Sequence, residues 1–511
     1  MNPAATFRRA VADRLRRYRR ASVASAPLAT MRLVVGLLVA WGALRFLAEG
    51  WVDRLLGTPF RFHFYGFAWV PCVGAAGGVA LYGFIAVSAL AVAVGYRYRW
   101  AAPACLAAFA LAELQDATHY LNHYYLVILL LGLLCVTPAA ARFSLDVAAG
   151  RVGRRTRVPA WCVHAFVAQL AIVYGFAGLA KVNADWLLRA MPLAIWLPER
   201  SGWPVLGELF AEPATAYVFS WAGCLYDLTI AGWLLWGRSR PLAYAAVLVF
   251  HGLTWLLFNI GLFPLIMAGT TLAFFPAEQH ERVWGRLREL VAGARALVST
   301  AGRRVVSAPP DGRRRPVRTG RRRPSGGALS LPLAVATAQV ASAQPTPTYA
   351  GTAAASPIPA TRKRTLALLG AYLAVQLALP LRALAYPGPA AWGEEGYRFG
   401  WRVMLVEKVG RAEFTVVDGA TGREALVDNR AFLTAYQEKQ MAIQPDFVLQ
   451  FAHHVARVYA DRHGFASPAV YADVRVALNG RRSRPLVDPA VDLATQRDGL
   501  AAKTWIRSLA P

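Results

Sequence analysis

The sequence predicts a mainly α-helical integral membrane protein: a bundle of about nine spanning helices, followed by an extramembrane α/β domain at the C-terminus. Three observations indicate this fold class. Hydrophobic residues make up 56% of the 511 residues, and the mean hydropathy of +0.35 is high for a soluble protein. Several apolar runs approach the roughly 20 residues that a spanning helix needs. The C-terminal stretch 387–511 returns to ordinary polarity.

The apolar runs give the expected order of the membrane segments. The predicted spans are 31–49, 76–96, 100–115, 124–140, 160–181, 216–236, 241–258, 260–276 and 364–384. Alternate loops between them are rich in arginine, whereas the intervening loops are poorer in basic residues and carry acidic ones. The positive-inside rule then predicts a cytoplasmic N-terminus and a C-terminal domain on the outer side.

Five parts follow from this organisation. Residues 1–30 form a basic cytoplasmic N-terminus without the pattern of a cleavable signal peptide, so we expect the first spanning helix to direct insertion. Residues 31–280 form the membrane domain. The basic segment 281–362 has the composition of a disordered cytoplasmic linker. Residues 363–386 hold the last membrane helix, and residues 387–511 form the outer domain.

Alternation and turn residues predict the elements of the outer domain. We expect strands at 398–407 and 412–418, and a further strand at 470–478 that is followed by the turn signal Asn479-Gly480. Residues 434–462 have the pattern of a helix that breaks and restarts at Gln444-Pro445.

Charge and cysteine usage exclude several classes of function. The formal net charge is +27, but the arginines concentrate at 8–20 and 282–323, beside membrane segments. Attraction to anionic membrane lipid explains this pattern better than nucleic-acid binding does. The five cysteines lie in or beside apolar runs and form no CxxC pair, so we expect neither a disulfide framework nor a metal site.

Polar residues interrupt the hydrophobic runs at three places. Lys181 ends one run, His251 lies inside another, and Asn122-His123 directly precedes a third. Ionisable groups at membrane depth are rare and are usually tied to function. The predicted topology places all three in the outer half of the membrane, so one chamber that opens outward could contain them, and the outer domain could cover it.

Each of these residues also has a structural interpretation. Lys181 lies near a helix end, where a lysine can extend to the headgroups or pair with Asp185 one turn later. Alternatively, burial against apolar neighbours would favour a neutral amine that can accept a proton. His123 could be an interfacial histidine bonded to a backbone carbonyl. His251 is less easily explained in this way, because aromatic and aliphatic residues surround it in sequence.

Several motifs occur in a fixed order along the chain. They are Asn122-His123-x-Tyr125-Leu126; Gly175-Phe176-Ala177-Gly178-Leu179-Ala180-Lys181-Val182-Asn183-Ala184-Asp185-Trp186; Tyr226-Asp227-Leu228; Phe250-His251; Gly396-Tyr397-Arg398-Phe399-Gly400-Trp401-Arg402-Val403-Met404; and Val470-Tyr471-Ala472-Asp473. In this order they resemble the vitamin K-dependent γ-glutamyl carboxylase family and its bacterial homologues, with an HTTM-type membrane domain. The resemblance runs from the first membrane segment to about Asp492.

The resemblance implies an activity. Enzymes of this family oxidise vitamin K hydroquinone with O2 to the epoxide, and the oxidation supplies a base strong enough to remove a γ-proton from a peptide glutamate. The resulting carbanion attacks CO2. The implied cofactor is therefore phylloquinol or menaquinol, with CO2 and O2 as co-substrates and no metal. The implied partners are a glutamate-containing peptide or protein, membrane lipid and a quinone reductase, but no nucleic acid.

The resemblance also implies roles for individual residues. Lys181 matches the family's catalytic lysine, which deprotonates the hydroquinone. Asn122 and His123 would orient the hydroquinone and stabilise developing oxyanion charge, with His251 in a supporting role. A strand from the outer domain would bring Trp401 and Met404 to the cofactor and Arg402 to the substrate.

The alanine- and arginine-rich composition is typical of a bacterial protein, for which we expect menaquinone as the quinone, the inner membrane as the location and a periplasmic outer domain. The vertebrate enzymes carry two adjacent lysines, and here Ala180 replaces the first. Two alternatives remain open at this point. One is a non-catalytic membrane protein that binds quinone or lipid on the same scaffold, and the other is a quinol-dependent enzyme with another acceptor.

Overall fold

The computed structural model describes residues 3–58, 60–258, 260–306 and 360–509. Met1–Glu281 and Ala360–Pro511 form one compact unit, and Arg282–Pro359 form another. The membrane helices and the C-terminal domain both belong to the first unit. Their mutual contacts are therefore part of one packed body.

Within the described residues, a helix occupies each of the nine predicted spans. These helices are α2 (Ala26–Ala48), α4 (Gly74–Val94), α5 (Tyr98–Glu113), α6 (Asn122–Val136), α8 (Trp161–Lys181), α12 (Pro213–Leu235), α13 (Arg240–Leu257), α14 (Phe263–Thr270) with η3 (Thr271–Phe274), and α16 (Lys363–Leu381). Six of the described helices are long and apolar enough to cross a membrane, while α6 and α14–η3 are shorter apolar helices. The mainly helical membrane fold is confirmed.

Small residues and one buried arginine fix the packing of the first spans. A Cβ atom at Gly36 of α2 would lie 2.6 Å from the backbone nitrogen of Ala93, so only glycine permits this close approach of α2 to α4. Arg32, fully buried, donates to the carbonyl oxygens of Ala93, Ala139 and Phe143. Its guanidinium thereby satisfies a carbonyl in the last turn of α4 and two carbonyls in the loop after α6.

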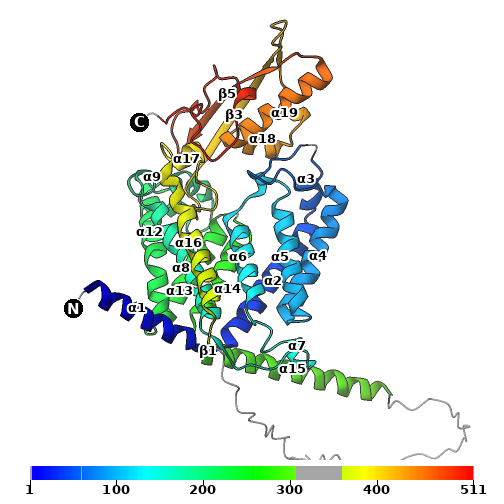
Figure 1. The fold of residues 1–511 in the computed structure, drawn as a ribbon, viewed down its shortest axis with the longest axis vertical. Helices are drawn as coiled ribbons and strands as arrows, with labels where there is room; N and C mark the ends of the chain where they lie inside the picture. The colour runs from blue at the N-terminus through cyan, green and yellow to red at the C-terminus, as the bar shows by residue number, and fades with distance from the viewer. Residues whose placement is uncertain (1–2, 59, 259, 307–359, 510–511) are drawn as a thin grey trace, which may run out of the picture. The chain divides into compact units, whose positions relative to one another are not determined.

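Further elements lie at the two ends of the bundle (Figure 1). They are α1 (Pro3–Arg20), α3 (Trp51–Leu56), η1 (Ala117–His119), α7 (Leu145–Ala148), α9 (Ala184–Arg189), α10 (Leu193–Trp196), η2 (Pro198–Arg200) and α11 (Gly207–Ala211). A two-stranded antiparallel sheet joins β1 (Ser22–Ala24) to β2 (Arg157–Pro159). It ties the chain before α2 to the chain before α8.

The first part of the basic linker differs from the prediction. Residues 281–362 were expected to be disordered, but α15 (Ala277–Val306) continues as a helix through the beginning of this segment. The reason is local composition. Alanine, leucine, arginine and glutamate are strong helix formers, and no proline occurs between Pro276 and Pro309. The remainder of the predicted linker, 307–359, lies outside the described residues.

The C-terminal domain is an antiparallel sheet covered by two helices. The strand order is β4 (Glu424–Leu426), β3 (Lys408–Val417), β5 (Ala469–Leu478) and β6 (Arg484–Pro485), with α18 (Ala435–Met441) and α19 (Pro445–His463) packed against it. The predicted break at Pro445 is confirmed, because the proline begins α19. Along β5 the even-numbered residues are buried, as the alternation indicated. Short elements η4 (Arg382–Ala385), α17 (Ala390–Gly393), η5 (Asn429–Ala431) and η6 (Leu493–Thr495) complete the domain.

The predicted strand at 398–407 is wrong. The first long strand begins at Lys408, and the preceding segment is irregular, with left-handed backbone at Phe399, Trp401 and Met404. Its alternating pattern is real, but the large side chains pack against the membrane helices rather than alongside a neighbouring strand. This irregular segment, residues 396–406, is called the inserted segment below.

Direct contacts join the C-terminal domain to the bundle. Oδ1 and Oδ2 of Asp185, in α9, accept two hydrogen bonds from Arg481, of 2.6 and 2.7 Å, and Oδ2 also accepts one from Asn479. Burial opposes ionisation of this carboxyl, but the hydrogen bonds from Arg481 and Asn479 outweigh it and lower the pKa of Asp185. On the other side of the bundle, Gln437 donates to Asp116 at 2.8 Å. The domain is thus held at two separate places above the helix ends.

Candidate active site

The side chain of Lys181 is buried between α8 and α12. Its Nζ donates to Oδ2 of Asp227 at 2.8 Å, and the two side chains are only 6% and 7% exposed. Nζ also lies 3.4 Å from the carbonyl oxygen of Ala177 and 5.1 Å from the ring centre of Trp186. Lys181 therefore does not extend to the headgroups, and its charge is balanced inside the protein.

A glycine brings the two members of this pair together. Gly178 lies one turn before Lys181 on α8, and a Cβ atom there would lie 2.7 Å from the backbone nitrogen of Leu228 on α12. Backbones that approach this closely require small residues at the crossing. Because Asp227 precedes Leu228, the same crossing places its carboxylate within reach of Nζ.

The Lys181–Asp227 pair lies in the wall of an apolar cavity with an empty volume of about 670 Å³. Its polar lining includes Tyr174, Lys181, Asp227, His251 and Thr254, and its apolar lining includes Phe219, Phe250, Phe258, Phe263, Met267 and Met404. A few polar groups in an apolar wall suit a ligand that has a flat apolar body and one or two polar atoms.

His251 is the second titratable group of this cavity that the sequence predicted. Its Nε2 lies 3.3 Å from the hydroxyl of Tyr174, which in turn lies 3.2 Å from Oγ1 of Thr271. Its Nδ1 is buried and has no hydrogen-bond partner in the structure. A buried polar atom without a partner is costly, so this nitrogen is available to a bound ligand.

The inserted segment closes the cavity on the side of the C-terminal domain. Val403 and Met404 line the cavity, whereas Trp401 is buried and stacks on Tyr125 of α6, with ring centres 5.1 Å apart. Left-handed backbone is uncommon for residues other than glycine and persists only where surrounding contacts impose it. The three such residues in this segment indicate that its path is fixed by its packing against the bundle.

Asn122 contacts the inserted segment. Its Nδ2 donates to the carbonyl oxygen of Arg402 at 3.1 Å, and its Oδ1 accepts from the hydroxyl of Tyr120 at 3.0 Å. The Nε atom of Arg402 is buried and has no partner in the structure. Burial lowers the pKa of the Arg402 guanidinium, and nearby Tyr397 and Glu394 oppose this effect. Asn122 thus positions the backbone beside Met404. Trp401 and Arg402 are not among the residues that line the cavity of Lys181.

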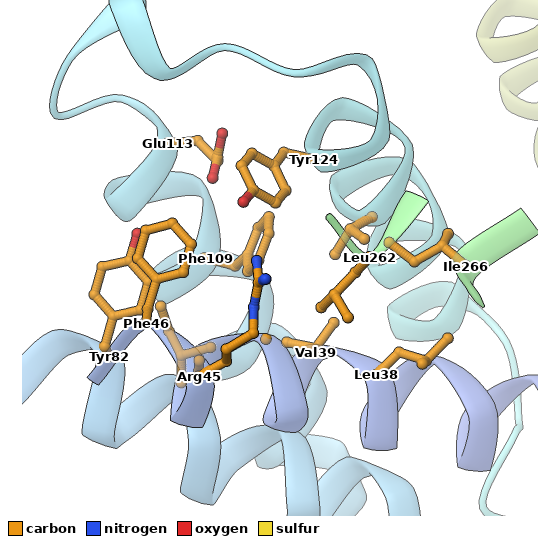
Figure 2. Close-up of a pocket in the computed structure, with 14 residues that line it drawn as sticks. Leu38, Val39, Arg45, Phe46, Tyr82, Phe109, Glu113, Tyr124, Leu262 and Ile266 are labelled. Atoms are coloured by element: carbon orange, nitrogen blue, oxygen red, sulfur yellow. The ribbon is translucent and has the colours of Figure 1, made fainter. Parts of the chain in front are cut away.

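His123 is not among the residues that line this cavity. Its ring contacts Phe263, with centres 5.8 Å apart, and Phe263 also contacts His251. A second cavity, shown in Figure 2, is lined by Tyr124, Arg45 and Glu113 among mostly apolar groups. The ring contact with Phe263, which does line the first cavity, therefore links His123 to that cavity.

Sequence reasoning missed Asp227 and Tyr174 as members of the site. A signal for Asp227 exists, because it is the only acidic residue of an otherwise apolar spanning helix. A buried carboxylate needs a cation, and Lys181 is the buried cation of the same region. The suggested pairing of Lys181 with Asp185 is wrong, since Asp185 instead binds Arg189 and Arg481. No group of three or more candidate metal ligands occurs among the described residues.

The comparisons with known proteins agree with this architecture. Residues 18–278 match the family model of the HTTM domain, and residues 361–510 match that of the vitamin K-dependent gamma-carboxylase lumenal domain. No solved structure matches the chain. The two family models together cover the membrane bundle and the C-terminal domain, so the chain belongs to the vitamin K-dependent gamma-carboxylase family.

Proposed function

We propose that this member of the vitamin K-dependent gamma-carboxylase family carboxylates glutamate side chains of a peptide or protein, coupled to epoxidation of vitamin K hydroquinone or menaquinol with O2 and CO2. The observation that carries the proposal is the buried Lys181–Asp227 pair in the wall of an apolar cavity, with His251 in the same wall. A protein that only binds a lipid or quinone would have no use for a charged pair at that depth.

The residues fit a reduced naphthoquinone. When bound and oxidised by O2, such a cofactor supplies a base stronger than any side chain, which removal of a γ-proton beside a carboxylate requires. The aromatic lining of the cavity suits the flat ring system. Lys181, Asp227 and the unpartnered Nδ1 of His251 are the groups that could meet its hydroxyl oxygens.

The pair can accept one proton from a substrate hydroxyl. If Lys181 carries its proton, the carboxylate of Asp227 is the vacant acceptor; if the proton lies on Asp227, the amine is vacant. The distance of 2.8 Å between Nζ and Oδ2 allows the proton to pass between them. Asp227 thus holds the ammonium that forms when Lys181 accepts a proton, and the Trp186 ring adds a cation–π contact.

His251 and Tyr174 form a second hydrogen-bonded pair in the wall of the cavity. The hydroxyl of Tyr174 can donate to Nε2 of His251, which fixes the imidazole tautomer with the proton on Nδ1. Nδ1 then becomes a donor for an oxygen atom in the cavity. A donor in a dry apolar wall stabilises developing negative charge more strongly than the same donor would in water.

The inserted segment excludes water and separates the two substrates. Met404 closes the cofactor cavity, and Asn122 holds the backbone at Arg402. We assign Arg402 to the carboxylate of the incoming glutamate, because its guanidinium has an Nε atom without a partner. We assign His123 to orienting Phe263 and, through it, the cofactor ring.

The remaining finer assignments follow from this function. The protein would lie in a bacterial inner membrane, with its N-terminus in the cytoplasm and the C-terminal domain in the periplasm, where glutamate-containing substrates would arrive. A quinone reductase would regenerate the cofactor, which reaches the cavity from membrane lipid.

Incorporation of radiolabelled bicarbonate into a glutamate-containing peptide tests the proposal. The purified protein receives chemically reduced vitamin K or menaquinol in air, and quinone epoxide is measured in parallel. We expect both products with the wild type and with Lys439→Ala, which removes an exposed lysine of the C-terminal domain, and neither with Lys181→Ala. Quinone binding without label or epoxide in the wild type would refute catalysis and favour the binding-protein alternative. Equal activity in Lys181→Ala would remove Lys181 from the proposed role.

A further inference from the structure

A basic hollow lies at the end of the bundle opposite to the C-terminal domain. It has an empty volume of about 1170 Å³ and is framed by the start of α5, the end of α6 and the loop after α7. Its charged lining consists of Arg97, Arg99, Arg151, Arg155 and Asp146. Four guanidinium groups thus surround one hollow that contains a single carboxylate.

The carboxylate of Asp146 already accepts hydrogen bonds from groups of the protein. Oδ1 of Asp146 accepts from the backbone nitrogen of Arg97 at 2.9 Å and from Nε of Arg151 at 2.8 Å, while Oδ2 accepts from the backbone nitrogen of Tyr98 at 2.9 Å. Burial opposes ionisation of Asp146, but these donors outweigh it and lower the pKa of its carboxyl. Arg97, Arg99 and Arg155 have no ion-pair partner among the described residues. The hollow therefore keeps an excess of positive charge.

Backbone contacts preform the hollow. The amide of Arg155 donates to the carbonyl of Ala141 at 2.9 Å, and the carbonyl of Arg155 accepts from Ser25 at 2.7 Å. Arg97 adopts left-handed backbone, which Asp146 stabilises by capping the start of α5. The arginines consequently project from fixed positions, so a ligand would not have to order the loop on binding.

The walls of the hollow are partly apolar. Trp100, Pro103, Cys135 and Val152 contribute to the lining, and Trp100 is 69% exposed. An exposed tryptophan beside clustered arginines at the end of spanning helices is typical of the membrane interface. A ligand that fits both features carries phosphate for the arginines and an apolar chain for the tryptophan side.

We propose that this hollow binds the phosphate headgroup of an anionic phospholipid. Guanidinium groups bind phosphate oxygens through paired, charge-assisted hydrogen bonds, and basic pockets between spanning helices on the cytoplasmic side are suited to such headgroups. The site is separate from the Lys181 cavity and does not depend on the carboxylation proposed above. It would fix the inner ends of α5 and α6 to the lipid layer.

Native mass spectrometry of the purified full-length protein tests the site. The protein is titrated with phosphatidylglycerol, and with phosphatidylcholine as a lipid without net charge. In Arg99→Ala/Arg155→Ala both exposed guanidiniums are lost while Asp146 and its contacts remain. At about 1 kcal/mol for each arginine near a lipid surface, we expect the affinity for the first phosphatidylglycerol to fall about 30-fold. Arg99→Lys/Arg155→Lys should lose only part of it, because charge remains without the paired geometry.

A matched control has the same change of charge elsewhere. Arg14→Ala/Arg17→Ala removes two exposed arginines from α1, and we expect its affinity to fall less than about threefold, because these side chains do not line the hollow. Equal losses in both double variants would show diffuse attraction and overturn the site. Equal binding of phosphatidylcholine would overturn the role of charge. If glycerol phosphate bound as tightly as phosphatidylglycerol, the ligand would be a soluble phosphate and the lipid assignment would be wrong.

Discussion

Removing the charge of Asp227 is the sharpest test of the candidate site. Asp227→Asn keeps the size of the side chain but leaves Lys181 as a buried ammonium without a carboxylate. Because the two side chains are 6% and 7% exposed, the pair belongs to the buried class, for which loss of one partner costs about 3–5 kcal/mol. An exposed pair would lose about 0–1 kcal/mol by the same substitution.

A double-mutant cycle separates the pair from the individual side chains. We expect Asp227→Leu and Lys181→Met each to destabilise the protein, whereas Lys181→Met/Asp227→Leu, which removes both charges, should recover most of the loss. The coupling energy should be about 3 kcal/mol. The free energy of unfolding can be measured in mixed detergent micelles with increasing SDS, followed by tryptophan fluorescence.

The exposed Arg411–Glu413 pair of β3 provides the control cycle. Its side chains are 69% and 49% exposed at a separation of 3.1 Å, so its coupling energy should stay below about 1 kcal/mol. A coupling energy for Lys181 and Asp227 no larger than that of this control would show that the buried pair is not formed in the membrane protein. In the carboxylation assay, Asp227→Asn should lose at least about 100-fold in rate, the usual minimum for a group that takes part in proton transfer.

Three further predictions concern the parts that position the pair. Gly178→Ala should destabilise the protein by about 1–3 kcal/mol and impair carboxylation. Gly175→Ala, whose added Cβ atom would have no neighbour within 4 Å, should be neutral or stabilising. Equal effects of the two substitutions on SDS unfolding would exclude the close helix crossing at Gly178. Asp185→Asn should cost about 2 kcal/mol at neutral pH. The folded-state pKa of Asp185 lies below its ordinary value of 3.8, so this stabilisation is present above about pH 4 and is lost as the pH falls through the lowered pKa. The melting curves of the wild type and of Asp185→Asn should therefore converge in acid. A difference between them that persists in acid would point to another cause. Asn122→Ala should release the carbonyl of Arg402 and lower kcat by about 10- to 100-fold while the fold stays intact. A change confined to the KM for quinol would instead indicate that Asn122 contacts the cofactor directly.

The membrane fold was predictable because its cause is local. Each spanning helix must carry its own run of apolar residues, so length and composition alone locate it. Lys181 and His251 could be selected for the same reason, since a polar residue in such a run is conspicuous. The partner of Lys181 could not be selected by proximity in sequence. Asp185 lies one turn away, but the end of α8 directs it outward to Arg481, and the crossing at Gly178 brings Asp227 from α12 instead.

The inserted segment shows where local pattern fails. Its alternating residues satisfy the rule for a strand, yet no neighbouring strand is available, because the four-stranded sheet begins only at Lys408. Asn122 and Tyr125 of α6 provide the contacts that determine its path, and both are more than 250 residues away in sequence. Similarly, nothing in the sequence around His123 indicates that it packs against Phe263 and does not line the cavity of Lys181.

The carboxylation proposed above would explain why the candidate site lies at the junction of the two domains. A cavity inside the helix bundle alone would be dry and accessible to an apolar cofactor, but it would lack access for a charged peptide side chain. A cavity in the C-terminal domain alone would admit the peptide, but it would also admit water, which would quench a strong base. Under that proposal the inserted segment would meet both requirements, because Met404 lines the cavity of the bundle while Arg402, held by Asn122, belongs to the C-terminal domain. The unfavourable left-handed backbone at Phe399, Trp401 and Met404 follows from the path of this segment between the bundle and the C-terminal domain.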